Sequence, residues 1–205
     1  MTDTFRYGFY LRPDLKTSIA VSQMHRVLRA QYGLIAGGLF MPHATIKGFY
    51  KSAAEPAEMV DRLNKTLAGF KPFRVYNGGS ILMGLRGVVT SWRDLPDGSR
   101  NTGLDDIQDR AFEALLPIIP ADCAFTKGDP RGPNGNPPFH AHITLAMADV
   151  EPHLREEVLA FVNQGGKVGS ESFMADTYHL FRFKADWNGA WWHTLSWELL
   201  HSWQF

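Results

Sequence analysis

Apolar residues follow strand-like spacing in some stretches of the chain and helical spacing in others. Residues 5–11 are rich in aromatics and stop at Arg12-Pro13-Asp14, which predicts a strand leading into a turn. From Thr17 or Ser18 to Gly33, apolar residues recur every three or four positions, which predicts a helix. On the same grounds we expect further strands within 42–50, 73–76, 81–92, 139–147, 172–183 and 191–200, and further helices within 55–67, 104–119 and 151–164.

Two stretches rich in glycine and other turn residues interrupt these elements. The Asn-Gly-Gly sequence at 77–79 is a hairpin signal and predicts that strands 73–76 and 81–92 pair with each other. Residues 127–138 are almost all Gly, Pro, Asn and charged residues, which predicts an irregular loop. This loop enters the strand that begins at residue 139, so it could cover a site there as a lid, or be a passive surface loop.

The second half of the chain repeats the order of the first. Each half contains a strand with a histidine, and each of these strands is followed by a helix that opens with Glu-Pro, at 55–56 and at 151–152. We therefore predict one α+β domain over residues 1–205 with two pseudo-symmetric lobes. The first lobe would span about 1–95 and the second about 96–205, with exchange of strands between the lobes allowed.

Composition and charge limit the classes of partner. Of the 205 residues 44% are hydrophobic, which suits a soluble globular protein, and 21 Lys and Arg balance 21 Asp and Glu. Without excess positive charge, an extended nucleic-acid duplex is an unfavourable partner, whereas a small nucleotide or short oligonucleotide needs few donors. Cys123 is the only cysteine, so an internal disulfide and a cysteine zinc cluster are excluded. No apolar run approaches the ~20 residues of a membrane span, and we expect a cytoplasmic protein.

Two short segments share the pattern His-x-Thr followed by an apolar residue. They are His43-Ala44-Thr45-Ile46 and His142-Ile143-Thr144-Leu145, and they begin 99 residues apart. Side chains alternate across a strand, so His43, Thr45 and Lys47 should share one face. In the second strand, His140, His142 and Thr144 should share a face in the same way. Each strand then presents imidazole and hydroxyl groups on one side and apolar anchors on the other.

This combination of groups suits metal-independent phosphate chemistry. One imidazole can take a proton from an attacking oxygen while the other protonates the leaving oxygen, and two hydroxyls can hold phosphate oxygens. His140 could contact substrate, or with His142 form part of a His-x-His metal site, but a metal needs further ligands that the sequence does not supply. Lys47 could place positive charge beside the phosphate or be a solvated strand-end lysine. Tyr10 and Tyr50 could stack on a base or belong to the core, and the tryptophans of the C-terminal tail are expected in the core.

The paired motifs resemble those of the 2H phosphoesterases, which include 2′-5′ RNA ligase-like proteins and cyclic nucleotide phosphodiesterases. The resemblance implies a bilobal α+β fold with antiparallel-rich sheets flanked by helices and with both motifs facing a central cleft. By the same resemblance, His43 and His142 would be the catalytic acid and base, and Thr45 and Thr144 the phosphate ligands, with no metal or cofactor. Many members have Pro before the second His and Arg shortly after its Thr, whereas this chain has Ala141 and Met147.

We therefore predict a metal-independent phosphodiesterase. Its substrates would be small nucleotides or short oligonucleotides with a 2′,3′-cyclic phosphate or a 2′-5′ linkage. A sensor that binds nucleotides without cleaving them, and an RNA 2′-5′ ligase, are the alternatives. The neutral charge and the lack of a phosphate-binding P-loop in the sequence count against the ligase.

Overall fold

The protein is built around one large antiparallel sheet. The computed structural model describes residues 5–205, and its seven-stranded sheet has the order β4-β5-β6-β2-β1-β8-β9, while β3 and β7 form a separate two-stranded sheet. The strands are β1 (Phe5–Leu11), β2 (Ala44–Tyr50), β3 (Phe73–Tyr76), β4 (Ser80–Met83), β5 (Gly87–Ser91), β6 (His142–Ala146), β7 (Ser172–Ala175), β8 (Thr177–Lys184) and β9 (Ser196–Gln204). The predicted α+β class with antiparallel sheets is confirmed.

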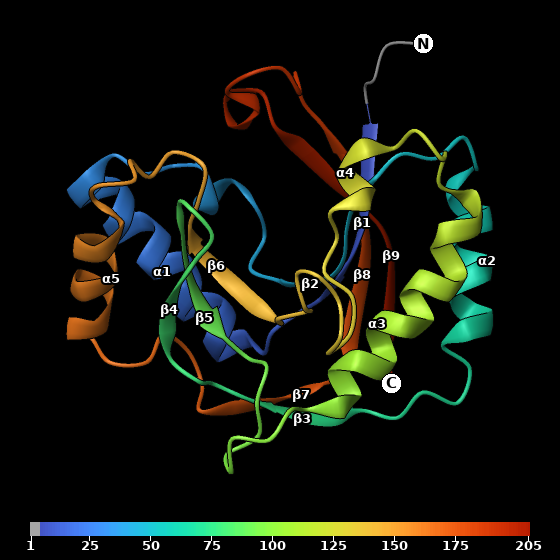
Figure 1. The fold of residues 1–205 in the computed structure, drawn as a ribbon, viewed down its shortest axis with the longest axis horizontal. Helices are drawn as coiled ribbons and strands as arrows, with labels where there is room; N and C mark the ends of the chain where they lie inside the picture. Colours follow the sequence, from blue (N-terminus) through green and yellow to red (C-terminus); the bar gives the residue numbers. More distant parts are fainter. Residues whose placement is uncertain (1–4) are drawn as a thin grey trace.

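Two groups of helices flank the two halves of the large sheet (Figure 1). The helices are α1 (Leu15–Tyr32), α2 (Pro56–Thr66), α3 (Thr102–Leu115), α4 (Ala124–Lys127) and α5 (Arg155–Gln164), with short 3₁₀ turns η1 (Gly37–Leu39), η2 (Leu116–Ile118) and η3 (Trp191–His193). Helix α1 contacts β6 and α5 contacts β4 and β5, whereas α3 contacts β2 and α2 packs on α3. Segments from both sides of residue 95 thus contribute to each half. Within residues 5–205, no helix is both long enough and apolar enough to cross a bilayer.

Local sequence signals fix both ends of α1, which lies beside the motif strands. The Asp14 carboxylate caps its first turn by accepting a hydrogen bond from the Thr17 amide at 2.8 Å. Gly33 ends the helix in the left-handed conformation at φ 72°, which glycine adopts without strain, and its amide donates to the Arg29 carbonyl. Val21 and Leu28 are buried two turns apart, so one face of α1 is anchored to the core and the register of the helix is set.

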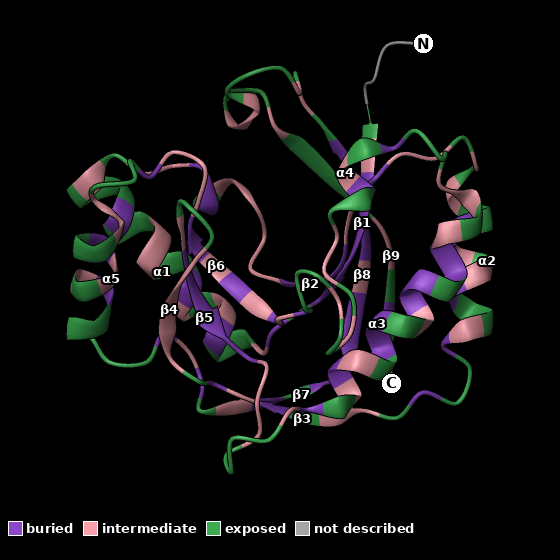
Figure 2. Ribbon diagram, in the orientation of Figure 1, coloured by how far each residue is buried: buried purple, intermediate pink, exposed green. Residues whose placement is uncertain are grey.

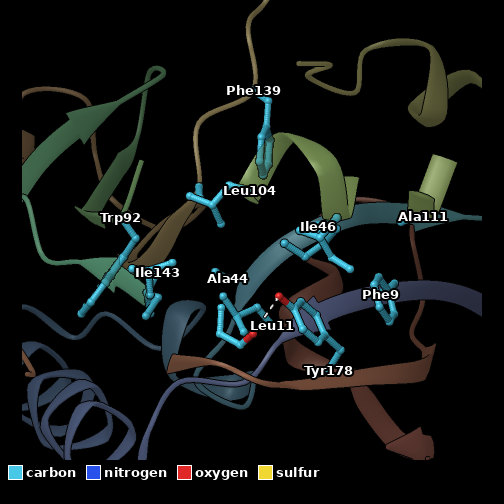
Figure 3. Packing of buried hydrophobic residues seen from close by; sticks show 14 of the residues in the cluster. Phe9, Leu11, Ala44, Ile46, Trp92, Leu104, Ala111, Phe139, Ile143 and Tyr178 are labelled. Atoms are coloured by element: carbon cyan, nitrogen blue, oxygen red, sulfur yellow. Dashed lines mark hydrogen bonds between the residues drawn. The ribbon is translucent and has the colours of Figure 1, made fainter. Parts of the chain in front are cut away.

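Strict alternation in β6 gives the sheet an apolar face and a polar face. Ile143 and Leu145 are buried, whereas His142 and Thr144 are only partly so. Ala44 of β2 is 1% exposed and belongs to the same core as Ile143, as the purple strand segments and the packing view show (Figures 2 and 3). The apolar side chains therefore hold both motif strands from one side and leave the other side free for chemistry.

The predicted pairing of 73–76 with 81–92 is wrong. Residues 81–92 hold a hairpin of their own, β4 with β5, and β3 pairs with β7. The cause is Asn77, whose side-chain amide donates to the carbonyls of Val168 and Ser170 at 3.0 and 3.1 Å. These bonds direct the chain after β3 toward residues 168–171 instead of into a hairpin turn.

The tryptophans of the C-terminal tail also differ from expectation, since most of them are not in the core. Trp203 is 8% exposed, but Trp197 is 42% exposed, and Trp187, Trp191 and Trp192 are partly exposed. The last three belong to the connection between β8 and β9, which projects beyond the sheet (Figure 1). Projection leaves these rings to pack mainly on neighbouring aromatics rather than under a helix layer.

Candidate active site

The two motif strands lie side by side at the centre of the sheet. Strands β2 and β6 are antiparallel, and Ala44 pairs with Ile143. Continuing this register by one residue in each direction sets His43 opposite Thr144 and Thr45 opposite His142. Because Ala44 and Ile143 point into the core, these four polar residues share the opposite face. The motifs are thus related by a local twofold axis through the central pair.

The same hydrogen bond orients each motif histidine. Nδ1 of His43 bonds to the carbonyl of Met41 at 2.7 Å, and Nδ1 of His142 bonds to the carbonyl of His140 at 2.7 Å. A carbonyl only accepts, so Nδ1 carries the proton in both rings. Nε2 is then the nitrogen that exchanges a proton with a ligand, and both rings present it in the same tautomer.

A cavity of about 190 Å³ opens between the two motifs. Both histidines and both threonines line it, so the structure brings together the four residues that the paired motifs single out. The remaining lining is Tyr10, His25, Gly37, Phe40, Met41, Pro42, Gly48, Phe49 and Met147. Among the described residues, neither threonine hydroxyl has a protein hydrogen-bond partner, so both can bind a ligand.

Burial keeps the imidazoles of this cavity neutral. Burial, with smaller contributions from the nearby rings of His142 and His25, lowers the pKa of His43 to about 4. Burial also lowers the pKa of His142 and the pKa of His25. At neutral pH the cavity therefore offers basic nitrogens and hydroxyls, and its lining contains no Lys, Arg, Asp or Glu.

Tyr10 forms one wall beside His43. Its ring meets the imidazole edge-on, with 4.6 Å between the ring centroids, and burial raises the pKa of its hydroxyl. The ring lies over the β1 backbone at Gly8, where a Cβ would come 2.1 Å from the tyrosine oxygen. Gly8 is thus required for the Tyr10 position, and Tyr10 lines the first cavity.

No protein-family model matches the sequence, and a search of curated proteins finds no match. Solved structures match over nearly the whole chain. LigT of E. coli in complex with 3′-AMP is 15% identical with a TM-score of 0.53, covering 100% of this chain and 99% of its own. TT0787 of Thermus thermophilus is 13% identical with a TM-score of 0.59, covering 97% of each chain. Another, described as a phosphoesterase, is 16% identical with a TM-score of 0.53, covering 98% of each.

These three proteins are 2H phosphoesterases. The chain has the 2H phosphoesterase fold. At these identities the likeness establishes the fold, and the roles of individual residues in this 2H fold rest on the site geometry.

His140 lies beside His142 but does not line the first cavity. Its Nε2 is 2.8 Å from the Ser91 hydroxyl, and its ring centroid is 6.5 Å from that of His142. Both rings line a smaller space of about 130 Å³ that Thr45 also borders. Burial, followed by the charge of Arg93, lowers the pKa of His140 to about 4. Among residues 5–205, no three His, Cys, Asp or Glu side chains gather as a metal site.

Lys47 does not share the face of His43 and Thr45, so its predicted position beside the phosphate is wrong. The register between β1 and β2 shifts twice. Tyr10 pairs with Thr45 but Phe9 pairs with Lys47, and Tyr7 then pairs with Tyr50. Such a β-bulge turns the following side chains of the 2H fold's central strand to the other face. Lys47 is 0% exposed and forms an ion pair with Asp129 instead of lining the cavity.

Tyr50 lies on the core face of β2 together with Lys47, because their partners Tyr7 and Phe9 share one face of β1. Tyr50 is 0% exposed, its hydroxyl donates to the Met59 sulfur at 3.5 Å, and its ring lies 5.8 Å from that of Tyr7. It is a core residue of this 2H fold.

His25 is a site residue that no sequence pattern singles out. This residue reaches the site from α1, where its Nε2 bonds to the carbonyl of Thr144 at 3.0 Å and its ring lines the cavity. Because His25 lies far before the second motif strand in the sequence, no local pattern links it to that strand. Its spacing of three or four residues from the apolar Val21 and Leu28 does predict the inner face of α1.

The loop of residues 127–138 is held next to the space that His140 and His142 line. The Gln108 side chain of α3 donates to the Pro130 carbonyl at 3.0 Å and accepts from the Gly132 amide at 2.8 Å. Asp129 adds the ion pair with Lys47, and the Arg131 guanidinium lies 4.7 Å from the centroid of the Phe112 ring. Asp129 and Pro130 of this loop line the space, so the loop forms one of its walls.

Proposed function

We propose that the protein is a metal-independent phosphodiesterase that cleaves 2′,3′-cyclic phosphates or 2′-5′ linkages in small nucleotides or short oligonucleotides. The observation that carries the proposal is the matched pair of imidazoles. Each has its Nδ1 engaged by a carbonyl and its Nε2 left for the ligand, and an unpaired threonine hydroxyl stands beside each. Two such groups on either side of one phosphate supply both proton transfers of phosphodiester cleavage.

The roles follow from the coupled protonation of the two rings. We assign the base to His43, because burial lowers its pKa to about 4 and so keeps the ring neutral, and the acid to His142. His43 Nε2 then accepts the proton of the attacking oxygen, and His142 Nε2 donates its proton to the departing ribose oxygen. The hydroxyls of Thr45 and Thr144 hold the non-bridging oxygens. With a cyclic phosphate the attacking oxygen belongs to water, and with a 2′-5′ linkage to the adjacent 3′-hydroxyl.

Two further features support a nucleotide ligand. Phe40 and Phe49 line the cavity with their rings 6.1 Å apart, and aromatic rings at this position can stack on a base. Structures that share the fold hold small nucleotides, since E. coli LigT has been solved with 3′-AMP and with NADP⁺.

A panel of substrates tests the proposal. We expect the wild-type protein to cleave, in excess EDTA, at least one member of a panel of nucleoside 2′,3′-cyclic phosphates and 2′-5′-linked oligoadenylates, and to leave 3′-5′-linked oligoadenylates intact. Product analysis identifies the broken bond. Saturable binding of a panel member with no turnover would replace the enzyme by a nucleotide sensor, and turnover only after a divalent metal is added would overturn the two-histidine mechanism.

The pH dependence gives a separate expected result. Cleavage needs one neutral and one protonated imidazole, and burial lowers both pKa values in the free protein, that of His43 to about 4. The kcat/KM profile should therefore be bell-shaped, with its alkaline limb below the usual imidazole pKa of about 6.5. The measurement is kcat/KM from about pH 3 to 8 on a phosphodiester, whose own phosphate does not titrate in this range. An alkaline limb well above pH 7 would contradict burial as the dominant influence.

A further inference from the structure

A second, positively charged cavity lies beside the site. It has a volume of about 280 Å³ and is formed by α1 and by residues of the 34–40 segment. From α1 it is lined by Ser22, Arg26 and Arg29, which share one helix face because they are spaced by four and three residues. Its lining also includes His25 and Phe40, and both of these residues line the first cavity too. The two cavities are therefore neighbours separated by two side chains.

No residue within 5–205 neutralises the charge of this second cavity. Its lining contains no carboxylate. In the part of the chain that the structure describes, neither Arg26 nor Arg29 has a side-chain hydrogen bond or ion pair. Two other arginines differ, since Arg93 is paired with Asp94 at 2.7 Å and Arg100 with Asp105 at 2.6 Å. Two free guanidiniums in one hollow attract an anion and can bind it with paired, charge-assisted hydrogen bonds.

The walls of this cavity are held in place without a ligand. The Asp149 carboxylate accepts hydrogen bonds from the amides of Ile35 and Ala36 at 2.6 and 2.8 Å, which fixes the 34–40 segment. On the other wall, the bond from His25 to the Thr144 carbonyl fixes α1 against the motif strand. Both walls are thus tied to β6 or to the turn that follows it, so the spacing between the two cavities is set by the fold.

We propose that Arg26 and Arg29 bind a second phosphate of the substrate, next to the phosphate that is cleaved. The inference rests on the proposed function and names its substrate class: nucleotides with at least two separate phosphate groups, such as short oligonucleotides or nucleoside bisphosphates. The first cavity contains no lysine or arginine, so the fixed positive charge for such substrates comes from these two residues. Ser22 adds a hydroxyl on the same face.

Binding of one-phosphate and two-phosphate probes tests this without any need for turnover. We expect wild-type protein to bind adenosine 3′,5′-bisphosphate roughly tenfold or more tightly than 3′-AMP in calorimetry. In the double variant Arg26→Gln/Arg29→Gln the ratio should fall to about one. Lys16→Gln is the matched control, because it removes one charge from the same helix at an exposed position that lines neither cavity. A ratio near one in the wild type, or equal weakening of both probes in the double variant, would overturn the proposal.

Turnover then separates this inference from the proposed function. Among cleaved substrates, the double variant should lower kcat/KM about tenfold for a dinucleotide ending in a 2′,3′-cyclic phosphate, and by less than about twofold for the cyclic mononucleotide. A preserved binding ratio in a protein that cleaves nothing would refute the proposed function and leave the second phosphate site standing. Cleavage with a binding ratio near one would do the reverse.

Discussion

Replacing His142 by alanine should lower kcat on any cleaved phosphodiester by about 10²–10⁴-fold, the usual contribution of a general acid or base. The same loss is expected for His43→Ala, because each ring carries one of the two proton transfers. The double variant should be little worse than either single variant, since the reaction uses both rings in one step. Steady-state kinetics on the substrate that the panel identifies measures all three.

A matched histidine controls for the substitution itself. His153 is exposed and lines neither the first cavity, nor the smaller space beside His140, nor the arginine-lined cavity, so His153→Ala should keep wild-type turnover. Thermal unfolding of each variant shows whether the fold persists, because His43 and His142 also hold the carbonyls of Met41 and His140. Near wild-type turnover by a folded His142→Ala protein would refute the assignment of this ring.

Replacing Asp129 by alanine should destabilise the protein by about 3–5 kcal/mol, the usual result of leaving one charge of a buried ion pair alone. The Lys47 side chain is 0% exposed, and its ammonium lies 5.3 and 5.4 Å from the ring centroids of Tyr50 and Phe112. Burial lowers the pKa of Lys47 and raises that of Asp129, and the charge of each partner opposes that shift. Urea unfolding at neutral pH measures the free-energy difference.

A pair of uncharged side chains of similar size separates the effect of the charges from the effect of filling these two positions. Lys47→Met with Asp129→Leu removes both charges together, so we expect it to lose less stability than Asp129→Ala alone. Lys47→Met, Asp129→Leu and the double variant form a thermodynamic cycle with the wild type. A loss below about 1 kcal/mol for Asp129→Ala would show that water reaches Lys47 and that the pair is not buried in solution.

The sequence was informative where a local rule decides the outcome. Alternation along 142–145 predicts which side chains of β6 are buried, and the structure confirms it. The end of α1 at Gly33 follows in the same way, whereas the helix begins after the Asp14 cap, three residues before the predicted Thr17. The repeated motif also singled out four residues that line one cavity, although they come from strands about a hundred residues apart.

The remaining features depend on contacts between distant segments. The shifts in β2 that turn Lys47 into the core are set by its pairing with β1, which no pattern within 44–50 records. The pairing of β3 with β7 depends on the bonds from Asn77 to a segment about ninety residues away. His25 joins the site because α1 packs on β6, and this packing is a property of the assembled sheet.

The twofold axis of the site passes through a very short seam. Strands β8 and β9 pair from Thr177 to Lys184, whereas β2 and β6 share the single pair Ala44 with Ile143. Bending the sheet at this seam breaks fewer ladder hydrogen bonds than bending it within either half. A phosphate bound by Thr45 on one strand and Thr144 on the other would link β2 and β6 at this point. An occupied site should therefore reduce bending between the two halves of the sheet.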